Sequence, residues 1–333
     1  MKAYIKDISY YLPSNSFSNE DINKEHPEWA IEKIMSKTGI KNRYICSEDE
    51  FASDMAIKVS NKLFKEYEIS PDSVDFILYC TQSPDYFLPT TACILQDKLC
   101  ISKNAGALDF NLGCSGYVYG LALAKGLLYA GVAKNILLIT SETYSKFIHQ
   151  NDKTNKTIFG DGASATIIST NGFAEINNFS LGTDGKGANN LIVKEGGTRF
   201  PKNTYIADLD SNNNLVNPSC LFMNGPEIFA FTSSAVPELV KEILIKNETS
   251  INSIDLFIFH QANKFMLEHL RKKIGISEDK FFYYLENCGN TVSSTIPIAL
   301  KEAINTMAIK NNTKVLLAGF GVGYSWGGVI LKF

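Results

Sequence analysis

Short, unbroken apolar runs that follow an acidic residue recur along the chain. One covers residues 76–79 after Asp75, and another covers residues 256–259 after Asp255. Runs of this length are typical of strands buried on both faces of a sheet. Their surroundings also match, because residues 70–82 resemble residues 250–262. This similarity indicates an internal duplication.

The order of the elements that follow these two runs repeats as well. In the first half we expect strands over 107–110, 135–140 and 162–168, and a helix over 114–130. In the second half we expect strands over 281–285, 314–318 and 327–332, and a helix after Asn290. Strands that alternate with helices imply βαβ units with right-handed crossovers. The sequence therefore predicts an α/β protein with two similar halves, 1–172 and 173–333.

The helix expected over 114–130 is apolar on nearly all sides and carries Gly116, Gly120 and Gly126 in its interior. A helix that is apolar all round is a buried helix. Interior glycines cost helix stability but permit a close approach of neighbouring backbone. We therefore expect this helix to lie in the middle of the molecule, where the two halves meet.

Composition and charge narrow the function. The chain has 333 residues, 45% of them hydrophobic, with a net charge of −3 and a pI near 5.9. This balance favours neither nucleic acid nor a membrane surface as partner. The start of the chain is charged and does not resemble a signal peptide. The seven cysteines are scattered, which argues against disulfides and structural zinc. We expect a cytoplasmic protein without metal or cofactor.

Cys114 is the first candidate for chemistry. It stands between Gly113 and Ser115-Gly116, at the junction of an expected strand and an expected helix. The unpaired N–H groups and the dipole at a helix start favour a thiolate. A buried cysteine is most often a plain core residue, but the glycines around this one would let a substrate approach closely. We interpret Cys114 as a nucleophile.

Two polar residues follow strands of the second half. His260 directly follows the apolar run 256–259, at the end of a strand where α/β proteins bind ligands. Asn290 lies before the last helix, at the place that corresponds to Cys114 in the duplication. Either residue could be structural, as a strand-end histidine or a helix cap. His26, His149 and His269 lie in polar or charged surroundings and are interpreted as structural or exposed.

Two glycine-containing segments have open interpretations. Residues 319–328 contain too many glycines for an ordinary strand, so they are either a turn or a source of amides for an oxyanion hole. Asp161, between Gly160 and Gly162, is interpreted as part of a structural turn.

Taken together, the motifs resemble the β-ketoacyl-[acyl-carrier-protein] synthase III family of the thiolase superfamily. The resemblance runs through nearly the whole chain, and the motifs occur in the family's order. They are Lys37-Thr38-Gly39-Ile40, Gly113-Cys114-Ser115-Gly116, Phe159-Gly160-Asp161-Gly162-Ala163, Met223-Asn224-Gly225-Pro226-Glu227-Ile228-Phe229, His260-Gln261-Ala262-Asn263, Gly289-Asn290-Thr291 and Gly321-Val322-Gly323-Tyr324-Ser325-Trp326-Gly327.

The resemblance implies a five-layered αβαβα thiolase fold, a homodimer and a Cys114-His260-Asn290 triad. Cys114 would take an acyl group from acyl-CoA or acyl-carrier protein, and the amides of Cys114 and Val322 would form the oxyanion hole. His260 and Asn290 would donate hydrogen bonds to the thioester oxygen of malonyl-acyl carrier protein while it loses CO₂. The resulting carbanion would attack the acyl-enzyme and give a 3-oxoacyl product.

The chain departs from the family where the family binds CoA and carrier protein. Lys33 and Lys37 stand at the positions of a Trp and an Arg that enclose the adenine, and Lys153 and Phe265 replace two further arginines. Lysine attracts phosphate but does not stack on adenine. The residues expected to contact substrate are Leu88, Phe87, Lys37, Lys153 and Asn263. The residues expected to dock the carrier protein are Lys264, Arg271, Lys272 and Lys273, although the basic run 271–273 would also suit a solvated helix face.

Leu88 stands where the acetyl-specific family member has a Phe that projects into the partner subunit's acyl pocket. We therefore expect acyl groups longer than acetyl, delivered by carrier protein rather than CoA. Phe87, one residue earlier, could restore the bulk.

Three alternatives remain at this stage. The enzyme could transfer the acyl group to a hydroxyl or amine without condensation. It could be a papain-like hydrolase, which uses the same three residue types, although the chain lacks that family's Trp-flanked Cys signature. It could also be an inactive partner subunit or acyl-binding module, which an intact triad disfavours.

Overall fold

The computed structural model describes residues 2–201, 208–209 and 215–333. Within them, one nine-stranded sheet has the order β13-β14-β15-β8-β1-β7-β6-β4-β5. Its strands are β1 (Tyr4–Tyr11), β4 (Phe76–Cys80), β5 (Gly106–Phe110), β6 (Asn135–Glu142), β7 (Gly162–Ser169), β8 (Ala174–Thr183), β13 (Leu256–Phe259), β14 (Lys314–Gly321) and β15 (Ser325–Lys332). Two-stranded sheets pair β2 (Asn15–Ser18) with β3 (Asn42–Ile45), β9 (Leu191–Ile192) with β12 (Phe222–Met223), and β10 (Asp208–Leu209) with β11 (Leu215–Val216).

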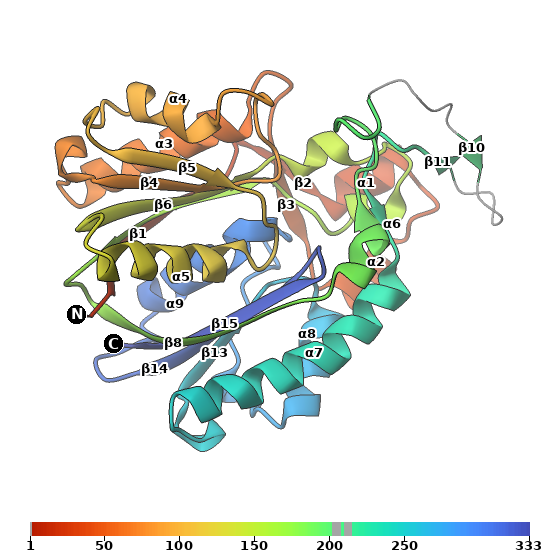
Figure 1. Cartoon of the computed structure of the whole chain (residues 1–333). Helices are drawn as coiled ribbons and strands as arrows, with labels where there is room; N and C mark the ends of the chain where they lie inside the picture. Colours follow the sequence, from red (N-terminus) through yellow and green to blue (C-terminus); the bar gives the residue numbers. More distant parts are fainter. Residues whose placement is uncertain (1, 202–207, 210–214) are drawn as a thin grey trace.

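The helices form three layers around two layers of strands (Figure 1). Helices α3 (Ala52–Glu66) and α4 (Thr91–Lys98) cover one outer face, and α7 (Gly225–Lys246) and α8 (Lys264–Ile274) cover the other. Helices α5 (Gly116–Tyr129) and α9 (Thr295–Asn305) lie between the strand layers. The short helices α1 (Asn19–Glu25), α2 (Ile31–Thr38) and α6 (Lys153–Lys156) lie at the right-hand end of the view. The predicted αβαβα arrangement is confirmed.

The pairing of the strands repeats in the two halves. In the first half, β4 is parallel to β5 and β6, β6 is antiparallel to β7, and β7 is antiparallel to β1. In the second half, β13 is parallel to β14, β14 is antiparallel to β15, and β15 is antiparallel to β8. The halves join where β1 pairs with β8 through Tyr4 and Ile5. We propose that the boundary lies near residue 172, between β7 and β8.

Two predicted strand segments differ from the structure. The strand expected over 281–285 is wrong, since only Phe281 makes an isolated bridge, to Phe257 of β13. The amide of Tyr284 instead donates to the side chain of Gln261, which takes this segment out of the sheet. The glycine-rich residues 319–328 are two strand ends with a tight turn between them, because Gly321 of β14 pairs with Ser325 of β15.

The central position of α5 follows from its composition. The helix contacts β4 and β6 of one half and β14 and β15 of the other. Tyr117, Leu121 and Leu128 are fully buried. Gly120 is packed against β6 so closely that a Cβ there would lie 2.5 Å from Leu138 Cδ1. The prediction of a buried helix where the halves meet is confirmed, and its first turn begins beside Cys114.

No helix among the described residues has the length and hydropathy that crossing a bilayer would need. The same part of the chain contains no group of three His, Cys, Asp or Glu side chains arranged to hold a metal ion. All seven cysteines are free thiols.

Candidate active site

Cys114 lies in the loop between β5 and α5 and is only 6% exposed. Its surroundings are tightly packed backbone. A Cβ at Gly321 would lie 2.8 Å from the Cys114 sulfur, and a Cβ at Gly116 would lie 2.3 Å from the Cys80 sulfur. Both positions therefore require glycine. The sulfur lies against the end of β14 from the opposite half of the molecule.

The Cys114 thiol is not ionised at neutral pH. Burial, and to a lesser extent the nearby Glu142 side chain, raise its pKa to about 12. The amides of Cys114 and Val322 act against this shift, because both interact favourably with the sulfur. The expectation that the helix start would give a resting thiolate is therefore wrong: desolvation outweighs the dipole. The same two amides are the pair expected to form the oxyanion hole.

His260 directly follows β13 and is 2% exposed. Its amide donates to the Ala318 carbonyl of β14 at 2.8 Å, which fixes the backbone. Its ring nitrogen Nδ1 lies 2.7 Å from the Thr295 hydroxyl, at the start of α9. Burial lowers the pKa of His260 to about 3, so the ring is neutral at physiological pH.

Asn290 is held by backbone of the first half. Its amide donates to the Ile158 carbonyl at 2.9 Å, and its carbonyl accepts from the Gly160 amide at 3.0 Å. The side-chain oxygen Oδ1 accepts from the Val292 amide at 2.9 Å. Among the described residues, the side-chain nitrogen Nδ2 has one long contact, 3.5 Å from the Ala262 carbonyl.

Cys114, His260 and Asn290 line one cavity of about 700 Å³. They are all buried, so they form its floor, while the exposed Lys33, Lys37, Lys153 and Phe265 form its mouth. Between floor and mouth the lining is largely apolar and comes from α2, α7, α8 and β9. The remaining lining residues are Ile34, Thr38, Thr154, Thr157, Ile158, Phe159, Leu191, Met223, Gly225, Pro226, Ile228, Phe229, Thr232, Ala262, Asn263, Met266, Phe320 and Gly321.

Comparison with known proteins places this chain in a family. The family models described as 3-oxoacyl-[acyl-carrier-protein (ACP)] synthase III and its C-terminal part match residues 108–185 and 244–333. A β-ketoacyl-[acyl-carrier-protein] synthase III of Clostridium perfringens is 39% identical over 97% of this chain and 96% of its own. The chain belongs to the 3-oxoacyl-[acyl-carrier-protein] synthase III family.

Solved structures of the family agree with the fold. A crystal structure of a 3-oxoacyl-(acyl-carrier-protein) synthase III has a TM-score of 0.96 and 46% identity, and each chain is covered completely. A second, from Burkholderia xenovorans LB400, has a TM-score of 0.92 and 36% identity over 100% of this chain and 94% of the other. The thiolase fold expected from the sequence is confirmed.

The mouth of the cavity in this family member carries positive charge. Lys33 and Lys37 extend from α2, and Lys153 is the first residue of α6. None of the three forms an ion pair within the part of the chain that the structure describes. Trp29 gives no flat platform here, because it is 6% exposed, stacks on His26 at 3.9 Å and lies under the Lys153 amine.

Phe87 and Leu88 lie outside the cavity of their own chain. They are in the loop between β4 and α4 and are 79% and 86% exposed. Neither lines the cavity, so one chain does not bring these two predicted substrate contacts to Cys114.

The residues expected to dock a carrier protein divide into two groups. Lys264, Lys272 and Lys273 are surface residues of α8. Arg271 is 9% exposed, and its guanidinium donates to Glu268 and to the Ile276 carbonyl. We therefore remove Arg271 from the docking group and assign it a structural role. Asn263 lines the cavity, but its side chain accepts from the Met266 amide and caps α8.

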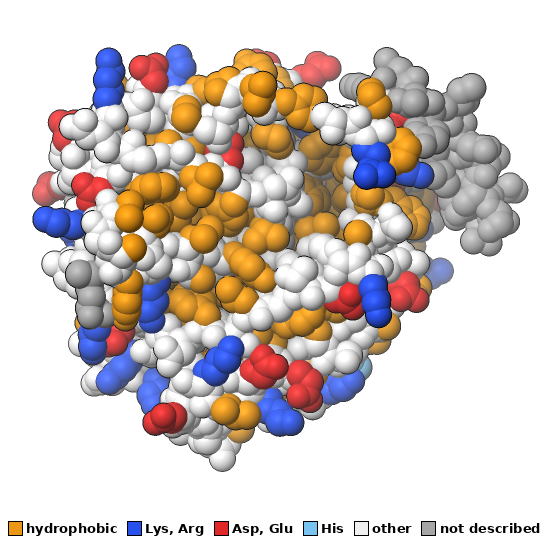
Figure 2. Space-filling model, in the orientation of Figure 1, with side chains coloured by type: hydrophobic (Ala, Val, Ile, Leu, Met, Phe, Trp, Pro, Cys, Tyr) orange, Lys and Arg blue, Asp and Glu red, His pale blue; other side chains and the backbone are white. Residues whose placement is uncertain are grey.

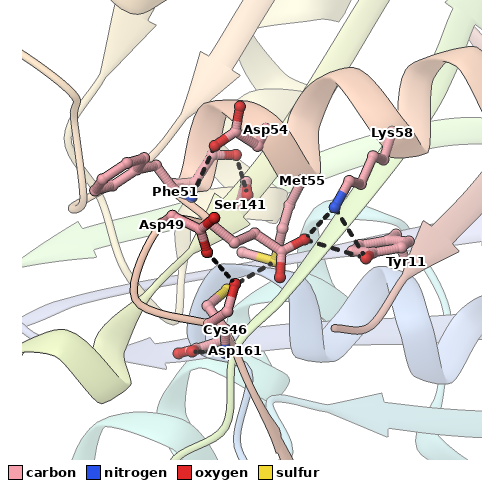
Figure 3. Close-up of polar contacts among 12 residues, drawn as sticks. Tyr11, Cys46, Asp49, Phe51, Asp54, Met55, Lys58, Ser141 and Asp161 are labelled. Atoms are coloured by element: carbon pink, nitrogen blue, oxygen red, sulfur yellow. Dashed lines mark hydrogen bonds and ion pairs between the residues drawn. The ribbon is translucent and has the colours of Figure 1, made fainter. Parts of the chain in front are cut away.

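Asp161 joins two loops of the first half. It is fully buried, and its carboxylate accepts from the amide of Cys46 (Figure 3). The same carboxylate also accepts from the amide of Ser145. The loop that follows Cys46 is tied to α3 nearby, because the Lys58 amine of α3 donates to the loop residue Glu50 and to Tyr11 (Figure 3). These contacts fit the structural role expected for Asp161, which does not line the cavity.

Sequence reasoning missed two buried polar residues beside the site. Glu142, at the end of β6, accepts from the Gln82 amide and the Ser293 hydroxyl, and burial raises its pKa to about 8. Thr295 contacts His260. A carboxylate three residues after the apolar run 136–139 was a signal for Glu142, whereas Thr295 is one hydroxyl in a series of hydroxyl residues.

Proposed function

We propose that the protein catalyses the decarboxylative Claisen condensation of an acyl thioester with malonyl-acyl carrier protein, through an acyl-Cys114 intermediate. The observation that carries this proposal is the convergence of Cys114, His260 and Asn290 on the floor of one buried cavity. Transfer of an acyl group to a hydroxyl or amine needs the nucleophile and its oxyanion hole. Two further side-chain nitrogens in the same cavity supply donors for an enolate oxygen.

The first half-reaction forms the acyl-enzyme. The Cys114 sulfur attacks the carbonyl carbon of the incoming thioester, and the amides of Cys114 and Val322 stabilise the oxyanion. When the tetrahedral intermediate collapses, the bond to the donor's sulfur breaks. Because Cys114 begins as a thiol, its proton ends on the departing thiol and the step is neutral overall. The apolar lining of the cavity suits an acyl chain.

The second half-reaction forms the new carbon–carbon bond. The malonyl thioester oxygen accepts hydrogen bonds from His260 and Asn290, and the carboxylate leaves as CO₂ while its electron pair forms the enolate. The enolate carbon attacks the acyl-Cys114 carbonyl. The carbon–sulfur bond breaks, the 3-oxoacyl product leaves on the carrier, and the Cys114 sulfur takes one proton from solvent.

The exposed apolar side chains support a homodimer as part of this proposal. Phe87, Leu88, Leu108 of β5 and Leu123 of α5 are all exposed in the single chain. Figure 2 shows hydrophobic side chains gathered over α5 and beside it, with charged side chains mainly around the edge of this face. A contiguous apolar patch of this kind is typical of an interface. A second copy would cover it, and the Phe87–Leu88 loop would reach the partner's cavity.

The charged mouth supports a phosphate-bearing donor. Lys33, Lys37 and Lys153 would attract the phosphate of a pantetheine arm, and Lys264, Lys272 and Lys273 would attract an acidic carrier. Because Trp29 is covered, adenine has no exposed indole on which to stack. We therefore expect carrier-bound donors to be preferred to CoA thioesters. A reducing, cytoplasmic location would keep Cys114 as the thiol, and fatty acid biosynthesis is the process that uses such a reaction.

Two assays on the wild-type protein test the proposed function. Intact-protein mass spectrometry should show one acyl adduct after incubation with acyl thioesters, and decarboxylation of malonyl-carrier protein should release CO₂ and a 3-oxoacyl product. Acyl loading without any condensation would contradict the proposal in favour of simple acyl transfer.

The same assays test the donor. We expect kcat/KM to rise from acetyl through butyryl to hexanoyl, because each buried methylene contributes up to about 0.8 kcal/mol. A maximum at acetyl-CoA would contradict this expectation and would point to Phe87 as the plug of the acyl pocket.

A further inference from the structure

The neutral state of His260 makes its tautomer important. A neutral imidazole carries one N–H, so it donates from either Nδ1 or Nε2, and the partner of one nitrogen determines the state of the other. Within the described residues, the one hydrogen-bond partner of Nδ1 is the Thr295 hydroxyl, at 2.7 Å. A hydroxyl can donate or accept, so its own second contact decides between the two tautomers.

The second contact of the Thr295 hydroxyl is the Val292 carbonyl, which already accepts another hydrogen bond. The hydroxyl lies 3.0 Å from this carbonyl, which also accepts the backbone N–H of Thr295 and has a second lone pair for the hydroxyl. The contact of the hydroxyl with Nδ1 is shorter, 2.7 Å, and this favours donation of the hydroxyl proton to the ring. We propose that Thr295 is a positioning residue: its hydroxyl donates to Nδ1 and fixes the proton of His260 on Nε2, the nitrogen left for the cavity.

The segment 292–295 also orients the side chain of Asn290. The Val292 amide donates to Asn290 Oδ1 at 2.9 Å, which leaves Nδ2 as the free end of the side chain. Two donors of the segment, the Val292 N–H and the Thr295 O–H, thus occupy the acceptor atoms of both active-site side chains. As a consequence, both side chains present N–H groups. The kinetic part of this inference rests on the proposed condensation, which needs two donors, but the tautomer itself does not.

Nitrogen-15 NMR of the protein without substrate tests the tautomer directly. The chain has four histidines, so His260 is assigned by comparison with a His260→Ala sample. We expect the pattern of a neutral ring with its proton on Nε2 in the wild type. In Thr295→Val, Nδ1 loses its donor, and we expect a mixture of the two tautomers. A wild-type ring with its proton on Nδ1 would overturn the proposal.

Kinetics provide the second readout. Thr295→Val should lower the rate of malonyl decarboxylation roughly 10- to 100-fold. Outright loss of a donor typically costs about 10²–10³, so the expected effect reaches at most the lower end of that range. The rate of acyl loading of Cys114 should fall far less. Thr295→Ser keeps the hydroxyl and should restore most of the activity. Thr291→Val is the matched control, because the Thr291 hydroxyl is buried nearby and has no hydrogen-bond partner among the residues that the structure describes.

The outcomes separate this inference from the proposed function. If the wild type decarboxylates and Thr295→Val, still folded and loading acyl groups, decarboxylates equally fast, the positioning role is wrong. If the wild type itself does not decarboxylate, the proposed function fails, and the NMR experiment still decides the tautomer.

Discussion

The two strand-to-helix junctions that correspond in the duplication hold their functional residues by different means. Cys114 is held by close packing, with Gly321 against its side chain and two amides directed at the sulfur. Asn290 is held by hydrogen bonds, through its backbone to Ile158 and Gly160 and through its side chain to Val292. The residue that must form and break a covalent bond is thus free of side-chain partners, whereas the donor keeps a fixed orientation.

The largest effect is expected at the packed junction. Cys114→Ala should abolish acyl-enzyme formation, because no other thiol lines the cavity among the described residues. The fold should remain, since the substitution removes one sulfur atom. Intact-protein mass spectrometry measures the adduct. Cys46→Ala is the control, as Cys46 is also buried but lies outside the cavity. Persistent acylation of Cys114→Ala would show that another residue is the nucleophile.

The hydrogen-bonded junction should separate the two half-reactions. His260→Ala and Asn290→Ala should each reduce malonyl decarboxylation by about 10²–10³, the usual cost of losing one oxyanion donor. Acyl loading should remain measurable, because the amides of Cys114 and Val322 are unchanged. CO₂ release and acyl loading, measured on the same preparation, give the two rates. An equal loss in both would mean that these residues serve the whole site rather than the enolate.

Overpacking tests the contact between the two halves. Gly321→Ala places a methyl group 2.8 Å from the Cys114 sulfur, so we expect loading to fall roughly tenfold through misplacement of the nucleophile. Stability should fall by about 1–3 kcal/mol. Gly126→Ala in α5 is the matched control, because a Cβ there meets no atom within 4 Å. It should stabilise the helix by about 0.5–1 kcal/mol. Similar behaviour of both variants in loading and urea unfolding would refute this account.

The smallest effect on turnover is expected from Glu142→Gln, which should appear mainly in the pH dependence of stability. The pKa of Glu142 rises from 4.5 to about 8 on folding, so between these values the folded state holds a proton that the unfolded chain has lost. Its contribution to the free energy of unfolding therefore falls as pH rises through this window. The glutamine variant lacks this dependence. Urea unfolding at pH 5, 6, 7 and 8 should show a wild-type disadvantage that grows with pH, and a constant difference would exclude the shift.

The structure brings Cys114, His260 and Asn290 to one cavity, and the first two follow the strands β5 and β13 that the sequence predicted. The apolar runs before Cys114 and His260 and the repeat around Asn290 are local signals. The thiolate at Cys114 was predicted wrongly for a physical reason: the helix start is local, but burial and Glu142 come from the tertiary structure. The buried Arg271 could have been foreseen, since Glu268 lies one helical turn earlier.

The strand expected over 281–285 failed through competition that the sequence does not display. Its aromatic residues suit a strand, and Phe281 does bridge to β13. The Phe282 amide still donates to the Phe257 carbonyl of β13, but the Tyr284 amide donates to the side chain of Gln261, and the ladder does not continue. The role of Thr295 could not be predicted because it depends on one rotamer against a ring that is far away in sequence.

The long-range pairing of strand β1 affects the rate at which the chain folds. Its residues form ladders with β7 and β8, and Tyr4 lies opposite Ser169. Contacts between residues so distant in sequence slow folding, because the intervening chain loses much entropy before the contact forms. Until β1 is in place, β7 has an unpaired edge that could recruit a strand from another chain. Refolding should therefore succeed best at low protein concentration, where a chain meets its own β1 before it meets a neighbour.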